Sequence, residues 1–136
     1  MDSTQNTATM HHLTASIDHK KQQLFKVLDQ LKTEEKSSKL SKIIVLTSDN
    51  FTADYLSCHL NLRGIEAASL HDFKSEAEND KNATSFNRGK VEVLVTNVDI
   101  KLTVSMVKHV INYDMFVPNI LYFEMNDTND IFHEEM

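Results

Sequence analysis

Glycine is scarce in this sequence, and its scarcity excludes a large class of binding site. The 136 residues include two glycines, Gly64 and Gly89. Loops that cradle a phosphate use several glycines, because the backbone must approach the ligand closely. Neither G-x-x-x-x-G-K-[S/T] nor G-x-G-x-x-G occurs. We therefore expect no complete nucleotide site and no bound cofactor, and we interpret both glycines as helix ends.

Cysteine is scarcer still, since Cys58 is the one cysteine in the sequence. An internal disulfide is excluded, and Cys58 falls in a helical pattern where we expect a small buried side chain. Seven histidines are present, but they lack the paired spacing of a zinc site. We expect no metal.

Long hydrophobic runs are also missing. No stretch approaches the roughly 18 to 20 apolar residues of a transmembrane helix. Residues 1–9 lack the basic and apolar blocks of a signal peptide. We expect a cytosolic or nuclear protein, with the cytoplasm as the first choice and no membrane partner. We also expect a disordered tail over residues 1–9 and one domain over residues 10–136.

Positive charge is short near the end of the chain. The formal net charge is −6, and no Lys or Arg follows Lys108. The acidic residues beyond it are Asp114, Glu124, Asp127, Asp130, Glu134 and Glu135. Proteins that bind nucleic acid usually present excess Lys and Arg, because neutralising phosphates releases counterions. This end of the chain is expected to repel a phosphate backbone.

Short apolar strands alternate with helices along the chain. The expected strands are residues 13–17 (a half-buried edge strand), 42–47, 66–71, 91–96 and 109–113. The expected helices are residues 18–31, capped by Asp18, residues 50–63, stopped by Gly64, and a helix capped by Ser75 that ends near residues 88–89. This order favours an α/β fold with a mainly parallel sheet, whose ligands sit at the carboxyl ends of the strands.

Three segments resemble the C-terminal RecA-like lobe of DEAD-box RNA helicases. They are Ile43–Thr47 with the following helix and residues 64–71, then residues 86–96, then residues 107–114 (Val-Lys-His-Val-Ile-Asn-Tyr-Asp). The family writes these as a hydrophobic strand, "LHG", "F..G...VLVATD" and "V.HVINYD". The likeness extends over about residues 11–125. It implies a RecA-like three-layer sandwich around a mainly parallel sheet.

The RNA-binding motifs of the family are altered in this chain. Asp72 replaces the glycine of "LHG", and Glu76 and Asn79 stand where the family carries the Gln and Arg of its RNA-binding Gln-x-x-Arg. In the next motif Thr96 is kept, but Asn97 follows it, and the motif contains no glycine. Lys101 lies in this motif, and Thr103 takes the place of its last acid.

The arginine motif is lost as well. Tyr122 keeps the family's spacing from Asp114, but residues 123–130 contain no arginine where the family has His-Arg-x-Gly-Arg-x-Gly-Arg. An arginine finger contributes roughly 10³ to 10⁵ in rate. The resemblance therefore implies a degenerate lobe that hydrolyses no ATP and is not an enzyme.

A retained core with an altered surface indicates a protein-interaction or self-association module, including a homodimer. The candidate contact residues are Met115, Phe116, Val117, Ile120, Leu121, Tyr122 and Phe123. Alternatively these residues complete the core, or an unpaired sheet edge recruits another strand. Degenerate helicase domains occur in Yb-type Tudor-domain proteins of the piRNA pathway, and that likeness implies gene silencing in a cytoplasmic ribonucleoprotein granule.

Weak RNA binding is the alternative function, with other domains of the protein supplying most of the affinity for RNA. Its candidate residues are the ones that the altered motifs leave at the strand ends, namely Thr47, Ser48, Thr96, Asn97 and Lys101. An active helicase half awaiting its partner lobe is a third interpretation. We reject it, because a partner lobe cannot replace arginines that this lobe must provide.

Overall fold

The computed structural model describes residues 8–36, 40, 42–97 and 107–115. These residues form five strands and three helices. In chain order they are β1 (Thr9–His12), α1 (Lys20–Glu35), β2 (Ile43–Leu46), α2 (Asn50–Leu62), β3 (Ala67–Leu70), α3 (Glu76–Asn87), β4 (Val93–Thr96) and β5 (His109–Asn112).

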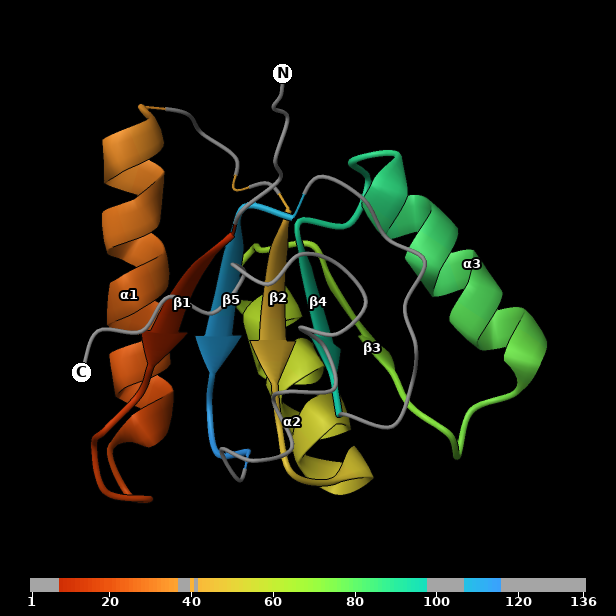
Figure 1. Ribbon diagram of the computed structural model, residues 1–136, viewed down its shortest axis with the longest axis horizontal. Coiled ribbons are helices and arrows are strands. Elements are labelled where there is room, and N and C mark those ends of the chain that lie inside the picture. The colour runs from red at the N-terminus through yellow and green to blue at the C-terminus, as the bar shows by residue number, and fades with distance from the viewer. Residues whose placement is uncertain (1–7, 37–39, 41, 98–106, 116–136) are drawn as a thin grey trace.

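The strands form one sheet in the order β1-β5-β2-β4-β3, and every neighbouring pair is parallel (Figure 1). The central strand, β2, is buried along its whole length. A continuous apolar run such as Ile43–Leu46 is typical of a strand covered on both faces. Because all strands run the same way, their carboxyl ends meet at one edge, which we call the carboxyl edge. It lies at the bottom of Figure 1.

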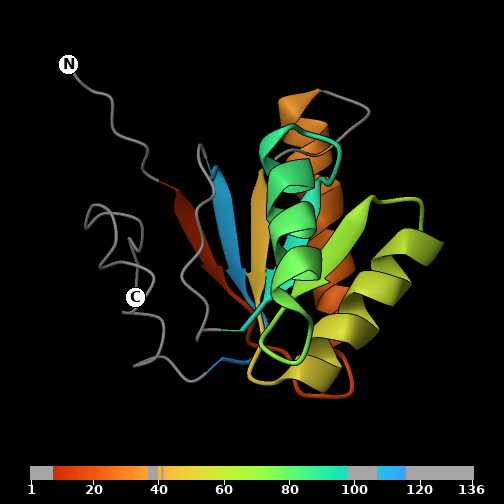
Figure 2. The same cartoon turned by 90° about the vertical axis from the view of Figure 1, so that its right-hand side faces the viewer.

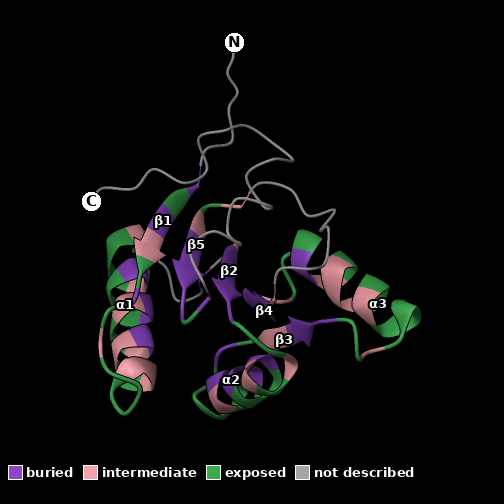
Figure 3. Ribbon diagram, turned by 60° about the horizontal axis from the view of Figure 1, so that its bottom comes forward, coloured by how far each residue is buried: buried purple, intermediate pink, exposed green. Residues whose placement is uncertain are grey.

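Helices cover both faces of this sheet. Helices α1 and α2 pack on one face (Figure 2), where Ile43 and Val45 share a core with Leu24 and Leu56. Helix α3 lies on the opposite face, where its fully buried Phe86 packs with Ile44 and Leu46. Figure 3 shows the buried strands between helices whose outer sides are exposed. The predicted three-layer α/β sandwich with a parallel sheet is confirmed.

The helix ends agree largely with the sequence patterns. The Asp49 side chain accepts a hydrogen bond from the Thr52 amide at 2.7 Å, and the Ser75 side chain caps α3. Gly64 follows α2 with a φ of 86°, a left-handed conformation that glycine adopts without steric cost. The predicted roles of Ser75 and Gly64 are confirmed.

The N-terminal part of the chain differs from prediction. The edge strand is Thr9–His12 instead of residues 13–17, because pairing with β5 places Met10 inward, whereas Ile17 is 83% exposed. Ala8 is buried, so the packed domain includes residues 8 and 9, which were assigned to the tail. Helix α1 begins at Lys20 without a side-chain cap, so Asp18 does not cap it. It also extends past residue 31, to Glu35.

Cys58 is exposed, which corrects its expected burial. The buried positions of α2 are Ala53, Leu56, Ser57 and Leu60. This spacing of three, four and seven residues defines the inward stripe of a helix. Cys58 falls outside the stripe, so helical periodicity alone misplaced it.

Three asparagine side chains from α2 and α3 bond to the backbone along the outer edge of β3. Both Asn61 side-chain groups bond to the Ala67 backbone, with Nδ2 donating to the carbonyl at 3.0 Å and Oδ1 accepting from the amide at 2.9 Å. Asn79 bonds in the same two-sided way to the His71 backbone. Asn82 Nδ2 donates to the Ser69 carbonyl at 2.9 Å. Amides from α2 and α3 therefore saturate alternate backbone groups that an added strand would need.

We predict that Asn61→Ala destabilises the domain by about 1–2 kcal/mol, because it removes both partners of the Ala67 backbone. Urea unfolding measures the loss. Gln30→Ala, an exposed substitution on α1, is the matched control and should change stability by less than about 0.5 kcal/mol. Equal effects of the two substitutions would contradict the role given to Asn61.

Two histidines meet where β1 pairs with β5. His11 Nε2 lies 3.1 Å from His109 Nδ1, and His109 Nε2 lies 3.6 Å from a Glu35 carboxylate oxygen. Burial lowers the pKa of His11, as does the neighbouring His109, against the opposing effect of Glu34. Burial also lowers the pKa of His109, although Glu35 acts in the opposite direction. Both rings therefore favour the neutral form in the folded protein.

We predict that the domain loses stability as the pH falls from neutral through the ordinary histidine pKa of 6.5. The unfolded chain binds more protons there, because the folded-state pKa values of His11 and His109 lie lower. Urea unfolding at a series of pH values measures the slope. His11→Gln should flatten it, and an unchanged slope in this variant would disprove the contribution of the pair.

Candidate functional site at the carboxyl edge

The strand order places five connecting segments side by side along the carboxyl edge. From one end to the other they follow β1, β5, β2, β4 and β3. Ligands of open parallel sheets bind along this edge. The residues that sequence analysis assigned to RNA contact all follow or end these strands, so each can be located here, except Lys101, which lies outside the described residues.

The two threonines predicted to face RNA point into the protein. Thr47 and Thr96 are completely buried. The Thr96 hydroxyl donates to the Leu70 carbonyl at 2.7 Å, and the Thr47 hydroxyl donates to the Asp49 carbonyl at 3.2 Å. The prediction of RNA-facing side chains is wrong for both, because each hydroxyl satisfies backbone at the end of a strand.

Ser48 lies on the surface, where a carboxylate holds it. Its amide donates to one oxygen of Asp114 at 2.8 Å, and its hydroxyl donates to the other at 3.1 Å. This pair joins the ends of β2 and β5. It also places a negative charge beside the one exposed hydroxyl among the predicted RNA contacts that the structure describes.

Asn97 belongs to a line of amides across the centre of the edge. Asn97 Nδ2 donates to Asn50 Oδ1, and Asn50 Nδ2 donates to Asp72 Oδ1 at 3.4 Å. The line connects the ends of β4 and β3 with the first residue of α2. Asp72, which replaces the family's glycine, is thus the acceptor at its end.

Sequence analysis missed the contribution of Asp54. Its carboxylate accepts from the Ser69 hydroxyl at 2.6 Å and lies 2.9 Å from Nε2 of His71, which is buried. The Phe73 amide donates to His71 Nδ1, so Nε2 carries the proton donated to Asp54. Desolvation alone would raise the pKa of Asp54, but the hydrogen bonds from Ser69 and His71 lower it overall.

This triplet is structural, because its order does not activate a nucleophile. In a catalytic triad the imidazole lies between the hydroxyl and the carboxylate. Here the carboxylate of Asp54 lies between Ser69 and His71, so the imidazole does not contact the hydroxyl. Among the described residues no group of three or more His, Cys, Asp and Glu side chains can hold a metal ion.

Large apolar side chains are exposed along the same edge. Within the described ranges the exposed large hydrophobic residues are Ile17, Phe51, Tyr55, Leu62 and Phe73. All except Leu62 follow a strand or lie in the first turns of α2, at the carboxyl edge. A cavity of about 510 Å³ opens there, lined by Ile17, Asp18, Lys20, Lys21, Phe51, Thr52, Tyr55, Tyr113 and Asp114.

Of the apolar contact residues predicted near the end of the chain, the structure describes Met115. Met115 is 4% exposed and belongs to the core, so its prediction as a contact residue is corrected. The other candidates, Phe116, Val117, Ile120, Leu121, Tyr122 and Phe123, lie outside the described residues.

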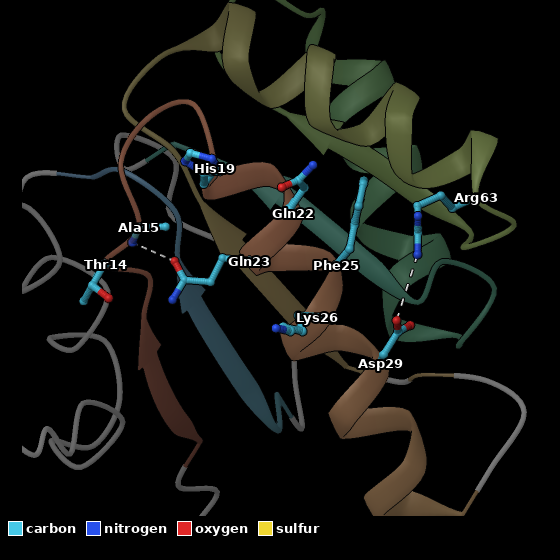
Figure 4. Close-up of a pocket in the computed structure, with 9 residues that line it drawn as sticks. All are labelled: Thr14, Ala15, His19, Gln22, Gln23, Phe25, Lys26, Asp29 and Arg63. Carbon is cyan, nitrogen blue, oxygen red and sulfur yellow. Dashed lines mark hydrogen bonds and ion pairs between the residues drawn. The ribbon is translucent and has the colours of Figure 1, made fainter.

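A second cavity, of about 570 Å³, lies between the loop after β1, α1 and the end of α2 (Figure 4). Arg63 stacks on the Phe25 ring at 4.1 Å and pairs with Asp29 at 3.9 Å. Gln23 accepts from the Ala15 amide at 2.8 Å. Two of the polar groups along this cavity, Arg63 and Gln23, are thus bonded to other lining residues.

Comparisons with known proteins identify the family to which the chain belongs. The family model described as "Helicase conserved C-terminal domain" matches residues 19–129, so the chain belongs to this family. The chain is 37% identical over 75 residues to DEAD-box ATP-dependent RNA helicase 35A of Oryza sativa, covering 54% of this chain and 12% of that protein. It is 31% identical over 110 residues to the ATP-dependent RNA helicase abstrakt of Drosophila melanogaster, covering 79% and 17%.

Solved structures give the same fold. The Pyrococcus furiosus Hef helicase domain matches with a TM-score of 0.61 at 27% identity, covering 76% of this chain and 21% of that chain. E. coli SrmB bound to regulator of ribonuclease activity A matches with a TM-score of 0.62 at 20% identity, covering 84% of this chain and 64% of that chain. A Saccharomyces cerevisiae Dbp5 variant bound to a Gle1 variant and IP6 matches with a TM-score of 0.51 at 18% identity, covering 88% of this chain and 38% of that chain.

The chain is therefore a C-terminal RecA-like lobe of the DEAD-box type, as the sequence motifs predicted. It spans only 12% and 17% of the lengths of the two curated relatives. No helix within the described ranges is long and apolar enough to cross a membrane.

We predict that Thr96→Val destabilises the domain by about 1–3 kcal/mol, because it removes the hydroxyl that the buried Leu70 carbonyl accepts from. Thr84→Val, the same substitution at an exposed site of α3, should cost less than about 0.5 kcal/mol. Urea unfolding compares the two. A Thr96→Val variant as stable as the parent chain would show that this hydroxyl is not needed inside the fold.

Proposed function

We propose that this lobe is a non-catalytic protein-interaction module whose carboxyl edge contacts protein in place of RNA and ATP. The observation that carries the proposal is the exposure of Phe51 and Phe73, at 78% and 84%, along the edge where ligands of this fold bind. Exposed apolar side chains gathered on one edge are typical of a protein contact.

The electrostatics of the edge disfavour a phosphate backbone. The carboxylates of Asp49, Asp72 and Asp114 lie beside the strand ends, where they face or flank the predicted RNA contacts. The ammonium group of Lys21 already donates to the Tyr55 hydroxyl at 2.9 Å. Binding of RNA depends on cations that neutralise phosphates, and this edge supplies few free ones among its described residues.

The sequence of the arginine motif supports the proposed absence of catalysis. Residues 123–130 contain no arginine, and such residues contribute roughly 10³ to 10⁵ in rate to phosphoryl transfer. Asp127 and Asp130 are among these residues in sequence. Without these arginines, we expect the lobe not to stabilise the charge that develops on the transferred group.

Two of the similar solved structures are complexes with a protein partner. SrmB is bound to regulator of ribonuclease activity A, and Dbp5 is bound to Gle1. We propose a comparable role for this chain, with a second copy as one partner, in a cytoplasmic ribonucleoprotein granule of the piRNA silencing pathway. The likeness to Yb-type Tudor-domain proteins, in the loss of helicase motifs, motivates this setting.

Residual RNA binding is the second candidate, because the curated relatives are RNA helicases. In that case the chain would act as the weaker half of a two-lobe core. Ser48 and Asn97 are the predicted contacts that remain at or near the surface in the described residues. The two functions differ in salt dependence, since phosphate contacts weaken steeply as salt rises.

We predict no ATP turnover by the chain and no binding of a fluorescent single-stranded oligouridine in about 50 mM salt, where phosphate contacts are strongest. Phosphate release and fluorescence anisotropy are the measurements. The triple variant Asp72→Gly, Glu76→Gln, Asn79→Arg, which restores the family motif, serves as the comparison and should bind the RNA more tightly than the parent chain. Salt-sensitive RNA binding or ATP hydrolysis by the parent chain would refute the proposed function.

A further inference from the structure

The cavity of about 570 Å³ between the loop after β1, α1 and the end of α2 has no part in the function proposed above (Figure 4). Its lining residues fall between Thr14 and Asp29 or at Arg63, within the ranges 8–36 and 42–97 that the structure describes without a break. It shares no lining residue with the cavity at the carboxyl edge. The helical face therefore carries a separate concave surface.

Arg63, the residue after α2, is held in place at one end of this cavity. Its guanidinium group lies 4.1 Å from the centre of the Phe25 ring and 3.9 Å from an Asp29 carboxylate oxygen. Stacking on an aromatic ring fixes the plane of a guanidinium group. The side chain is still 47% exposed, and a single contact at 3.9 Å leaves most of its five N–H donors available. A carboxylate can accept two parallel hydrogen bonds from such a group.

Two further donors line the cavity on α1. Gln22 and Lys26 are four residues apart, so they project from the same side of the helix. Both are exposed, and within the described ranges neither side chain has a hydrogen-bond or ion-pair partner. Because these groups are unpaired, a ligand that accepts from them displaces water alone and breaks no internal bond.

The positive charge of this surface is local. Among the lining residues Lys26 and Arg63 face one carboxylate, that of Asp29. The whole chain has a formal net charge of −6, and helix α3 on the opposite face carries three acidic residues against one lysine, Lys81. A ligand that complements this cavity therefore carries negative charge and hydrogen-bond acceptors.

We propose that this cavity binds a short acidic peptide segment of a protein partner, with one carboxylate on Arg63 and another on Lys26. A peptide also carries backbone N–H groups that can donate to Asp29, whereas an RNA strand would bring phosphates beside that carboxylate. Binding of RNA also depends on a longer series of cations than the two found here. A volume of about 570 Å³ is of the size that encloses a few side chains. This surface is additional to the carboxyl edge, so the inference goes beyond the proposed function and does not depend on it.

The test begins with a random library of twelve-residue peptides displayed on phage and selected against the whole chain. The enriched peptides should contain two or more Asp or Glu residues. One of them is then synthesised with a fluorescent label, and its affinity is measured by anisotropy. Arg63→Glu and Lys26→Glu should each weaken binding by about tenfold, because each replaces an attraction with a repulsion. Lys81→Glu makes the same charge change at an exposed position of α3 and should alter the affinity by less than about twofold.

A compensating change separates a contact from a general loss of structure. Replacing the peptide's carboxylates one at a time with lysine should give one peptide that binds Lys26→Glu more tightly than it binds the parent chain. Misfolding of the variant would not produce this reversal. Lys26 has no partner within the described residues, so its substitution also removes no internal bond.

Enrichment of neutral or basic peptides, or of none, would overturn this inference, as would an affinity that neither Arg63→Glu nor Lys26→Glu changes. Loss of peptide binding in Phe73→Ser would also overturn it, because the peptide would then occupy the carboxyl edge. All these results leave the proposed function standing. RNA binding that Arg63→Glu leaves intact would refute the proposed function alone, whereas RNA binding that Arg63→Glu abolishes would refute both. The two failures are therefore distinguishable.

Discussion

The burial of β2 between two helical layers is the constraint on which the rest of this lobe depends. Ile43–Leu46 contributes alternate side chains to both cores and pairs with β4 and β5 on either side. All five strands run parallel to it, so their carboxyl ends meet along one edge. The fold fixes where a site must lie, and the residues at that edge alone determine which ligand it takes.

Polar side chains at this edge bond within the fold. Thr96 matches the family's motif, yet its hydroxyl serves the Leu70 carbonyl inside the fold. Asp72 departs from the motif and accepts from Asn50. Ser48 and Asp114 satisfy each other. Polar groups that are already paired bind an additional ligand only by exchanging partners, so a residue that matches a motif need not face a ligand.

The sequence predicted the features that depend on local pattern. The apolar run of β2, the Ser75 cap and the stop at Gly64 each involve neighbouring residues, and all three agree with the structure. The features that depend on distant partners were missed. Thr9–His12 is a strand only because β5 pairs with it, although its own alternation is weak.

The candidate site shows the same division. Motif comparison located the strand ends correctly, but it could not give the direction of a side chain. Thr47 and Thr96 were placed on the surface and are buried. Asp54 carried no recognisable signal, because it meets His71 and Ser69 only after α2 packs against β3. Phe51 and Phe73 were not singled out, since exposure depends on packing that sequence periodicity does not describe.

A protein partner could pair with the backbone of the outer strand β3 or pack on the side chains of the carboxyl edge. At β3, Asn61, Asn79 and Asn82 bond to the backbone groups that an added strand would use. Strand addition that used these backbone groups would have to break five hydrogen bonds. The carboxyl edge demands no such exchange for its apolar residues, because Phe51 and Phe73 are in contact with water. Burying them gains free energy directly, so side-chain packing at this edge is favoured over strand pairing at β3.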